Sequence, residues 1–508
     1  MNRTEYLAKN VKFTMAGELL LALLKFVSRR VFVVLLGKEY LGLNGLFADV
    51  LSMLSVAELG AGVSITYSLY RPVACGDTNM IKSLMQLYRR IYRMVGAAVL
   101  AAGLTLTPFL DFFVKEMPEN IPHIPLIYVL NLLNTSISYF FIYKSTLLYV
   151  HQKKYVETAI RAGVTLAATG AQIAVLLLTG NYLYYLLLSI GATLIQNTVI
   201  SFKANRLFPY LREKNSSSLP AETMEEIRRN VKAMLLHRVG TIAVFHTDNL
   251  LISKFVGIVT AGLYSNYTMI RNFLSILITA LFDAVTPALG NLTATESQTC
   301  KQDAFCRLNF FSAWLFGWMS ICLFFLYDPF MDLWLGSGYR LPKPAVLLIV
   351  LNFYVNSMRV PVTSSKSVSG LFWDDRYKSI LEAILNLLVS VLLAQRWGIT
   401  GILLGTLIST SALPFWIEPL VLFRRGLNLP VSTYFFRYGV YLSVTVLVGL
   451  ITGALCQMTS ESVWGFLVKT LLCSVVPNIL YIAAYCRTDE FHFLRSWVVH
   501  MVKNVSAN

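Results

Sequence analysis

The stretch LNFFSAWLFGWMSICLFFLY, residues 308–327, carries no charged side chain over 20 positions. A helix of that length spans about 30 Å, the thickness of the hydrocarbon core of a bilayer. Arg307 and Asp328 flank the stretch. The segment is therefore predicted to be a membrane-spanning helix.

The composition of the whole chain is that of a membrane protein. Of its 508 residues, 56% are apolar and 14% are charged, and the mean hydropathy is +0.61. Soluble domains carry roughly 25% charged residues. The net charge of +16 does not indicate a nucleic-acid partner, because the basic residues concentrate in alternate loops, as the positive-inside rule predicts.

Apolar blocks of similar length recur along the chain and predict an all-α polytopic membrane protein with about 14 transmembrane helices. The first block contains Glu18, Lys25 and Arg29, so we interpret it as a span and not as a cleavable signal peptide. The predicted spans are 12–36, 40–70, 84–114, 124–150, 156–179, 182–203, 231–256, 260–291, 304–328, 344–370, 377–395, 398–423, 432–456 and 462–486.

The loop charges predict the orientation of the chain. An even number of spans places both termini on one side of the membrane. The loops on that side contain 27 Lys and Arg residues, and the loops on the opposite side contain 6. Because basic loops stay inside, both termini are expected in the cytoplasm of a cell whose cytoplasmic membrane holds the protein.

The two halves of the chain resemble each other. Gly37 and Gly257 each lie 26 residues after the Val of a Val-Lys pair, and Lys144 recurs as Lys366 at an offset of 222. Further matches fall in order at nearly the same offset, which predicts two pseudo-symmetric six-helix lobes related by an axis along the membrane normal. The predicted parts are an N-terminal lobe (1–203), a cytoplasmic linker (204–230), a C-terminal lobe (231–424), two further helices (425–486) and a cytoplasmic tail (487–508).

Charged side chains inside the predicted spans are candidates for function, because each costs about 2.5–3.5 kcal/mol on insertion scales. Basic residues outnumber acids among them, and they form polar stripes, one of which is interrupted by Pro361, where we expect a kink. The candidate substrate-binding residues are Lys25, Arg29, Arg30, Lys144, Arg271, Asn352, Asn356, Arg359 and Lys366. The candidate coupling or ion-pairing acids are Glu18, Asp49, Glu58, Asp248 and Asp283.

Two interpretations of these charges stay open. In the first, cations without carboxylate partners line a water-filled interior and bind an anion such as a phosphate or pyrophosphate, for which Arg offers bidentate geometry. In the second, the charges pair, Glu18 with Lys25 or Asp49 with Arg29, and hold helices in register. The excess of cations favours the first interpretation.

The remaining reactive residues predict no metal site, cofactor or enzyme active site. The seven cysteines are odd in number and several lie in apolar segments, so neither a disulfide framework nor a metal site is expected. His237 and His246 could couple protons, but a structural role is the favoured interpretation.

Several stretches resemble one transporter family. Leu43-Asn-Gly-Leu-Phe47 with Ala57-Glu-Leu-Gly60 resembles the second helix of Wzx-type polysaccharide flippases. Thr247-Asp-Asn-Leu-Leu-Ile-Ser-Lys254 resembles the start of their second lobe. These flippases belong to the multidrug/oligosaccharidyl-lipid/polysaccharide (MOP) exporter superfamily.

The resemblance implies a MATE-like, V-shaped protein that works by alternating access. The implied substrate is an undecaprenyl-pyrophosphate-linked oligosaccharide, moved from the inner to the outer leaflet for surface polysaccharide biosynthesis. The family has a cationic cavity, which Arg29, Arg30, Arg271 and Arg359 match in kind. Such a protein would have as partners the lipid bilayer, other polysaccharide-assembly proteins and a Na⁺ or H⁺ counter-ion.

Two alternatives remain. A cation-coupled multidrug exporter of the same superfamily would favour an acidic cavity over a basic one. A membrane-bound glycan polymerase or ligase would need a sizeable outer loop with catalytic Arg or His, whereas the longest predicted outer loop, 328–343, has no His and one Arg. The sequence therefore predicts a transporter and not an enzyme.

Overall fold

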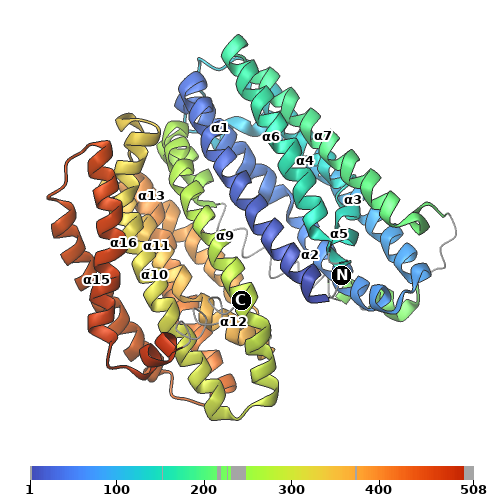
Figure 1. The fold of residues 1–508 in the computed structure, drawn as a ribbon. Coiled ribbons are helices and arrows are strands. Elements are labelled where there is room, and N and C mark those ends of the chain that lie inside the picture. The colour runs from blue at the N-terminus through green and yellow to red at the C-terminus, as the bar shows by residue number, and fades with distance from the viewer. Residues whose placement is uncertain are drawn as a thin grey trace. The chain divides into compact units, whose positions relative to one another are not determined.

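The computed structural model describes residues 3–151, 153–213, 219–225, 227–229, 231, 247–371 and 374–496. Within these ranges the chain forms helices and no strand, so the predicted all-α fold is confirmed. The chain divides into two compact units, Met1–Ser265 (unit 1) and Asn266–Asn508 (unit 2) (Figure 1). The division falls within one helix, α9 (Ile258–Thr295). The lobe boundaries given by the sequence repeat stay a prediction.

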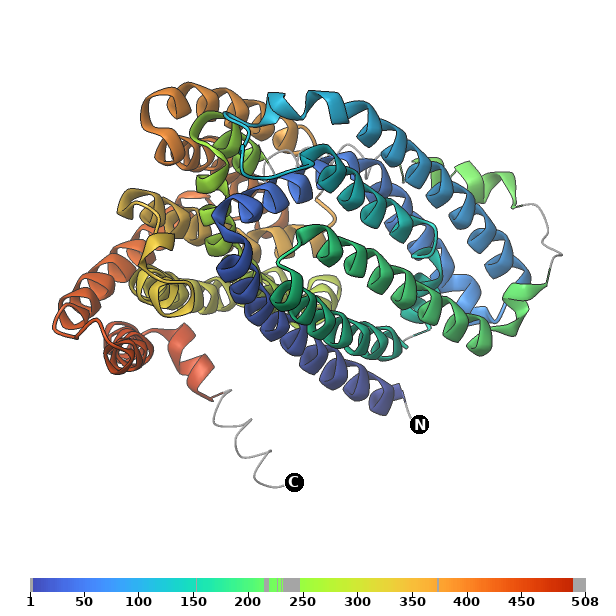
Figure 2. The ribbon, with the colours of Figure 1, turned by 90° about the horizontal axis from the view of Figure 1, so that it is seen from above.

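Unit 1 is a bundle of helices in which α1 packs against α6, α6 against α7, and α3 against α2 and α4 (Figure 2). Asp77 begins α3 by accepting a hydrogen bond from the backbone N–H of Met80 at 3.0 Å. The elements are α1 (Arg3–Leu54), α2 (Val56–Cys75), α3 (Thr78–Leu106), η1 (Thr107–Phe113), α4 (Ile124–Tyr139), α5 (Tyr143–Val150), α6 (Lys154–Thr179), α7 (Tyr182–Leu207), η2 (Pro209–Arg212) and η3 (Ile252–Val256).

Unit 2 is built around α10, which packs against α11, α15 and α16, while α11 packs against α13. Apolar and aromatic side chains fill these contacts; Phe310, Phe316 and Tyr481 are fully buried. After α9, the elements are α10 (Gln298–Trp334), η4 (Ser337–Tyr339), α11 (Lys343–Met358), α12 (Val360–Val368), α13 (Lys378–Ala412), α14 (Pro414–Val421), η5 (Leu422–Leu427), α15 (Ser432–Cys456) and α16 (Val463–Tyr485).

Two of the long helices are broken at a glycine. The backbone of α1 has φ 88° and ψ −175° at Gly37, and that of α13 has φ 54° and ψ −131° at Gly398. Residues with a Cβ rarely adopt such angles, so glycine is required at both breaks. Gly37 lies between the predicted spans 12–36 and 40–70, and Gly398 is the first residue of the predicted span 398–423, so each long helix contains parts of two predicted spans.

The predicted polytopic membrane fold is confirmed. In the described part of the chain, eight helices are long and apolar enough to cross a membrane, or nine if α4 and α5, bent by 46°, form one span. The run 378–427 is counted once although it contains the break at Gly398. The predicted span 231–256 lies mostly outside the described residues. The total of about 14 spans therefore stays a prediction.

Some local features recur at the offset that the sequence repeat predicts. Gly37 and Gly257 both have positive φ, at 88° and 134°. Lys144 lies in the short helix α5 after the 16-residue helix α4, and Lys366 lies in the short helix α12 after the 16-residue helix α11. These parallels accord with a duplicated unit, while the superposition of two whole lobes stays a prediction.

Candidate functional site

The breaks in the helices of unit 2 bring charged residues into its interior. Pro361 lies in the first turn of α12 and Pro414 begins α14, and a proline there lacks the N–H that would continue the preceding helix. The helix is interrupted at Arg359, between α11 and α12 and two residues before Pro361, while the size of a kink there stays a prediction. Because α11 and α13 end at these breaks, short segments with charged side chains face one another inside the unit.

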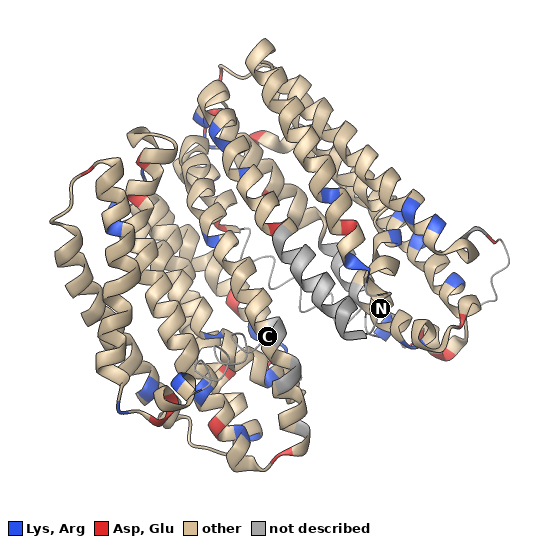
Figure 3. Ribbon diagram, in the orientation of Figure 1, with Lys and Arg blue, Asp and Glu red and all other residues tan. Residues whose placement is uncertain are grey.

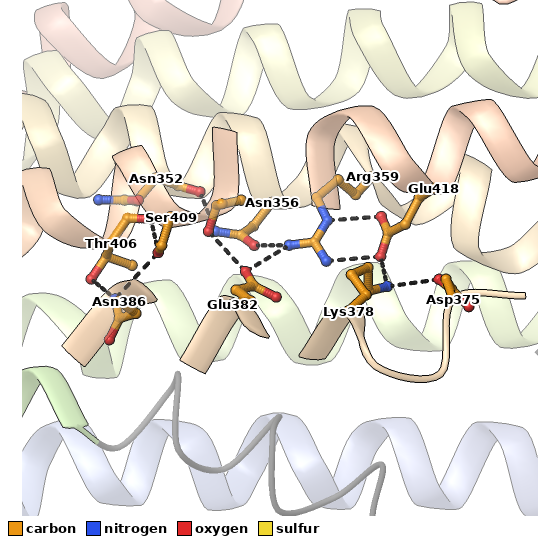
Figure 4. Close-up of polar contacts among 11 residues, drawn as sticks. Asn352, Asn356, Arg359, Asp375, Lys378, Glu382, Asn386, Thr406, Ser409 and Glu418 are labelled. Atoms are coloured by element: carbon orange, nitrogen blue, oxygen red, sulfur yellow. Dashed lines mark hydrogen bonds and ion pairs between the residues drawn. The ribbon is translucent and has the colours of Figure 1, made fainter. Parts of the chain in front are cut away.

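Arg359 forms a bidentate ion pair with Glu418 of α14 (Figure 4). Its Nε donates to Glu418 Oε2 at 2.9 Å and its Nη2 donates to Oε1 at 2.9 Å. Its Nη1 donates to Asn356 Oδ1 at 2.9 Å and lies 3.7 Å from Glu382 Oε1. The Glu418 side chain is 0% exposed and that of Arg359 is 17% exposed, so this pair is isolated from bulk solvent.

The network continues through two lysines. Lys378 donates to Glu418 and lies 3.2 Å from Asp375 Oδ2. Asp375 also accepts a hydrogen bond from Lys366 of α12. All of these side chains are buried. Three cations and three carboxylates therefore connect α12, the start of α13 and α14, and we call this set the unit 2 charge network: Arg359, Lys366, Asp375, Lys378, Glu382 and Glu418.

Uncharged polar groups extend the network along α13. Thr410 donates to Glu382 Oε1 at 3.1 Å, and Asn386 Nδ2 donates to Thr406 Oγ1 at 2.9 Å. Asn352 Nδ2 donates to the carbonyl of Leu403 at 2.9 Å. The predicted candidate Asn352 thus joins α11 to α13, whereas Asn356 donates to the carbonyl of Asn352 in its own helix and accepts from Arg359.

This geometry corrects one expectation. Arg359 and Lys366 are predicted from the sequence to be available to an anion, but Arg359 is paired with Glu418 and Glu382, and Lys366 with Asp375. A guanidinium whose fork already holds a carboxylate cannot hold a phosphate in the same way. A signal was present in the sequence, because Glu382 and Glu418 both fall inside predicted spans and belong in the count of charges.

The cations of α1 in unit 1 differ from those of the unit 2 charge network in their partners. Lys25, Arg29 and Arg30 follow one another on α1, with Lys25 and Arg30 exposed and Arg29 half-buried. Arg29 lies close enough to Tyr182 and Tyr185 of α7 to interact electrostatically with both. Within the described ranges, none of the three cations has a carboxylate oxygen within 4.0 Å. Figure 3 shows where the Lys, Arg, Asp and Glu residues lie along the ribbon.

The acids of unit 1 have other partners than those proposed from the sequence. Glu18 accepts a hydrogen bond from Arg161 of α6 and not from Lys25. Asp49 accepts one from Asn249 Nδ2 at 2.6 Å. Both contacts fasten α1 to other segments of the same unit, but only that of Glu18 is an ion pair, so the pairing interpretation is supported for Glu18 with a different partner.

The other candidates lie as follows. Lys144 donates to Ser201 Oγ of α7 at 2.6 Å, and Asp248 is buried in unit 1. The side chains of Glu58 and Asp283 lie outside the part of the structure that is described, as do His237 and His246. These placements neither add to nor remove from the set of available cations.

Arg271 of α9 is the comparable cation of unit 2. It is half-buried, and no carboxylate oxygen among the described residues lies within 4.0 Å of it. Tyr267, in the same predicted stripe, has a structural role instead: its hydroxyl donates to Asp328 Oδ1 at 3.1 Å and accepts from the Leu341 N–H at 3.1 Å. The described structure therefore leaves Lys25, Arg29, Arg30 and Arg271 as intramembrane cations without a carboxylate partner.

Comparison with known structures identifies the fold. A lipid II flippase, MurJ in an inward closed conformation, aligns with a TM-score of 0.64 at 12% identity, covering 93% of this chain and 98% of that one. An inward-facing multidrug resistance transporter of the MATE family, in the MOP superfamily, aligns with a TM-score of 0.57 at 13% identity, covering 81% and 98%. The Vibrio cholerae MATE transporter VcmN gives 0.57 at 13% identity, covering 83% and 98%.

No protein-family model matches the chain, and no curated protein matches it by sequence. At these identities the structural likeness defines the fold alone. The fold predicted from the sequence, that of the MATE-like transporters, is confirmed, and this chain has the architecture that MurJ and the MATE proteins share.

Proposed function

We propose that this protein is a membrane transporter that moves a lipid-linked anionic glycan across the cytoplasmic membrane by alternating access. The substrate best supported is an undecaprenyl-pyrophosphate-linked oligosaccharide destined for a surface polysaccharide. The fold supports transport, because structures named as a lipid II flippase and as multidrug transporters share it. The resemblance of its motifs to Wzx-type flippases supports the glycan substrate.

The observation that carries the proposal is the set of intramembrane cations without a carboxylate partner in the described structure: Lys25, Arg29, Arg30 and Arg271. An unpaired cation at membrane depth is unfavourable unless water or an anion meets it. A pyrophosphate supplies that anion and accepts bidentate hydrogen bonds from Arg. We propose that these residues contact the pyrophosphate at successive stages of transport.

The unit 2 charge network has a different role from that of the unpaired cations. Because its three cations are each held by carboxylates, we assign it to the internal structure of unit 2 and not to substrate binding. A multidrug exporter for cationic compounds is the second candidate, since MATE transporters share the fold. That function would use carboxylates available to a cationic drug, whereas Glu418 and Asp375 already hold cations.

The test is transport by purified protein in proteoliposomes loaded with a fluorescent polyprenyl-pyrophosphate oligosaccharide. Arg29→Ala and Arg271→Ala are expected to lower the rate of translocation at least about tenfold, because a charge-assisted hydrogen bond contributes roughly 1.5–3 kcal/mol. Arg396→Ala, at an exposed position, is the matched control and is expected to retain the rate. Normal rates in both test variants, at equal amounts of folded protein, would reject the proposal.

The proposed orientation has its own test. A reporter that is active only in the cytoplasm, fused at the C-terminus, is expected to be active, in line with the excess of basic residues in the loops on that side. Activity of an exported reporter at the same position would reverse the assignment.

A further inference from the structure

An apolar groove lies on the surface of unit 2, where α14 meets the start of α15. Its volume is about 450 Å³, within the range of small-molecule sites in proteins. Five of its six lining residues are apolar, and the sixth contributes only a hydroxyl. The lining residues are Trp416, Ile417, Leu420, Val431, Ser432 and Phe435.

The groove occupies the side of α14 away from the charge network. Glu418, on the inner side of this short helix, is fully buried against Arg359. Trp416, on the groove side, is 53% exposed, and its ring lies 4.4 Å from that of Phe435 between ring centres. The helical run 378–427 that contains α14 is apolar enough to cross a membrane. Exposed aromatic and aliphatic side chains on such a run meet lipid rather than water.

A cation without a carboxylate partner follows the groove. Arg424 comes one turn after Leu420 on the continuous run of α14 and η5, which places the two side chains on neighbouring positions of the helix surface. Arg424 is exposed, and no described carboxylate lies within 4.0 Å of it. The adjacent Arg425 forms an ion pair with Asp374. An apolar groove and an exposed guanidinium one turn beyond one of its lining residues together supply the two parts needed to bind a lipid with a charged headgroup.

We propose that this groove binds one anionic phospholipid of the surrounding membrane, with an acyl chain along the groove and the headgroup phosphate on Arg424. Arg recognises phosphate by bidentate hydrogen bonds, and a basic residue at the membrane surface attracts anionic lipids. The lipid is a resident ligand of unit 2 and not the transported substrate. Since α14 also carries Glu418, a lipid that packs on its outer side stabilises the helix that anchors Arg359.

The site is tested by native mass spectrometry of the full-length protein, with phosphatidylglycerol and phosphatidylcholine added separately. Wild-type protein is expected to retain phosphatidylglycerol in preference to phosphatidylcholine. Arg424→Gln should reduce that preference about tenfold, because the charged hydrogen bond to phosphate is lost. Arg425→Gln is the matched control, and it should change the preference less than about twofold, because Arg425 already holds Asp374.

A second variant tests the groove itself. Leu420→Trp fills the groove and should lower the retention of both lipids; Ser432→Phe does the same from α15 if the first variant does not fold. Equal losses in the Arg424 and Arg425 variants, or no preference for the anionic lipid in the wild type, would overturn the proposal. Displacement of phosphatidylglycerol by an equimolar polyprenyl phosphate would also overturn it, because the groove would then belong to the carrier lipid. The proposed transport could fail its own test without changing any of these results.

Discussion

Arg359 of unit 2 and Arg29 of unit 1 are both arginines inside membrane helices, yet their surroundings differ. Arg359 is held by Glu418 through two hydrogen bonds of 2.9 Å and lies 3.7 Å from Glu382. Arg29 lies beside two tyrosines, with no carboxylate within 4.0 Å in the described part of the chain. The cost of a charge in a membrane helix therefore indicates function only after the partners of that charge are known.

The comparison predicts a ranking of stability effects, which can be measured by unfolding the purified protein in detergent and following its tryptophan fluorescence. The largest loss is expected for Arg359→Gln, about 3–5 kcal/mol, because Glu418 is left as a buried charge with fewer partners. The amount of folded protein in the membrane should fall with it. A loss below about 1 kcal/mol would show that the pair is not isolated from solvent as its burial indicates.

A double variant distinguishes the net contribution of the ion pair from the cost of leaving one buried charge unpaired. Arg359→Met combined with Glu418→Leu removes both charges, and such replacements are often neutral or stabilising. We expect the double variant to be more stable than Arg359→Gln alone. If the double variant is the less stable of the two, the pair contributes net stability beyond avoiding an unpaired charge.

An intermediate effect is expected for Arg161→Gln. Its partner Glu18 is 33% exposed and Arg161 is 35% exposed, so part of the charge of Glu18 can still be solvated once the arginine is gone. The expected loss is roughly 1–2 kcal/mol. The matched variant Glu18→Gln should cost about the same, and a difference of several kcal/mol between the two would mean that one residue has a further partner.

How much of the fold and of the site could be predicted from the sequence depends on the sequence separation of the interacting residues. The membrane fold could be predicted because apolar blocks of about 20 residues are a local property of the sequence. For the same reason, the break at Gly37 falls between two predicted spans and the break at Gly398 falls at the start of one. The partner of Arg359 could not be assigned, because Glu418 is 59 positions away and reaches it only after two helices break and pack.

The same limit applies to the acids of unit 1. The sequence places Glu18 and Lys25 on one face of a helix, and their spacing of seven residues makes them candidates for a pair. Arg161, 143 positions away, is the actual partner, because α6 packs along α1. Side chains on a neighbouring helix can approach more closely than those two turns apart on the same helix.

A small effect is expected for the ion pair between Arg340 and Asp332, which lies outside the predicted spans. Arg340 lies in the loop after α10 and binds Asp332 through its Nε at 2.7 Å and also through Nη2. This hydrogen bonding raises the pKa of the Arg340 guanidinium above its ordinary value, so the pair stays charged on the arginine side at any physiological pH. Arg340 is 38% exposed, and a pair open to water contributes under about 1 kcal/mol. Arg340→Gln at low and high salt should therefore give nearly the same unfolding curve as the wild type; a large, salt-insensitive loss would place the pair among the buried ones.

The smallest loss of stability is expected for Arg29→Gln, which tests directly whether Arg29 and Arg359 have different roles. Arg29 has no carboxylate partner among the described residues, so its removal leaves no described carboxylate without a partner. The free energy of unfolding should stay within about 0.5 kcal/mol of the wild type, as for substitutions that break no special contact. Arg30→Gln, at the exposed neighbouring position, is the control for the general loss of one positive charge from α1. If Arg29→Gln costs as much as Arg359→Gln, then Arg29 is a structural residue, and the distinction between the two arginines fails. If the variant is stable but does not transport, Arg29 serves the substrate, because glutamine lacks the charge and the bidentate fork of the guanidinium while the stability of the protein is unchanged.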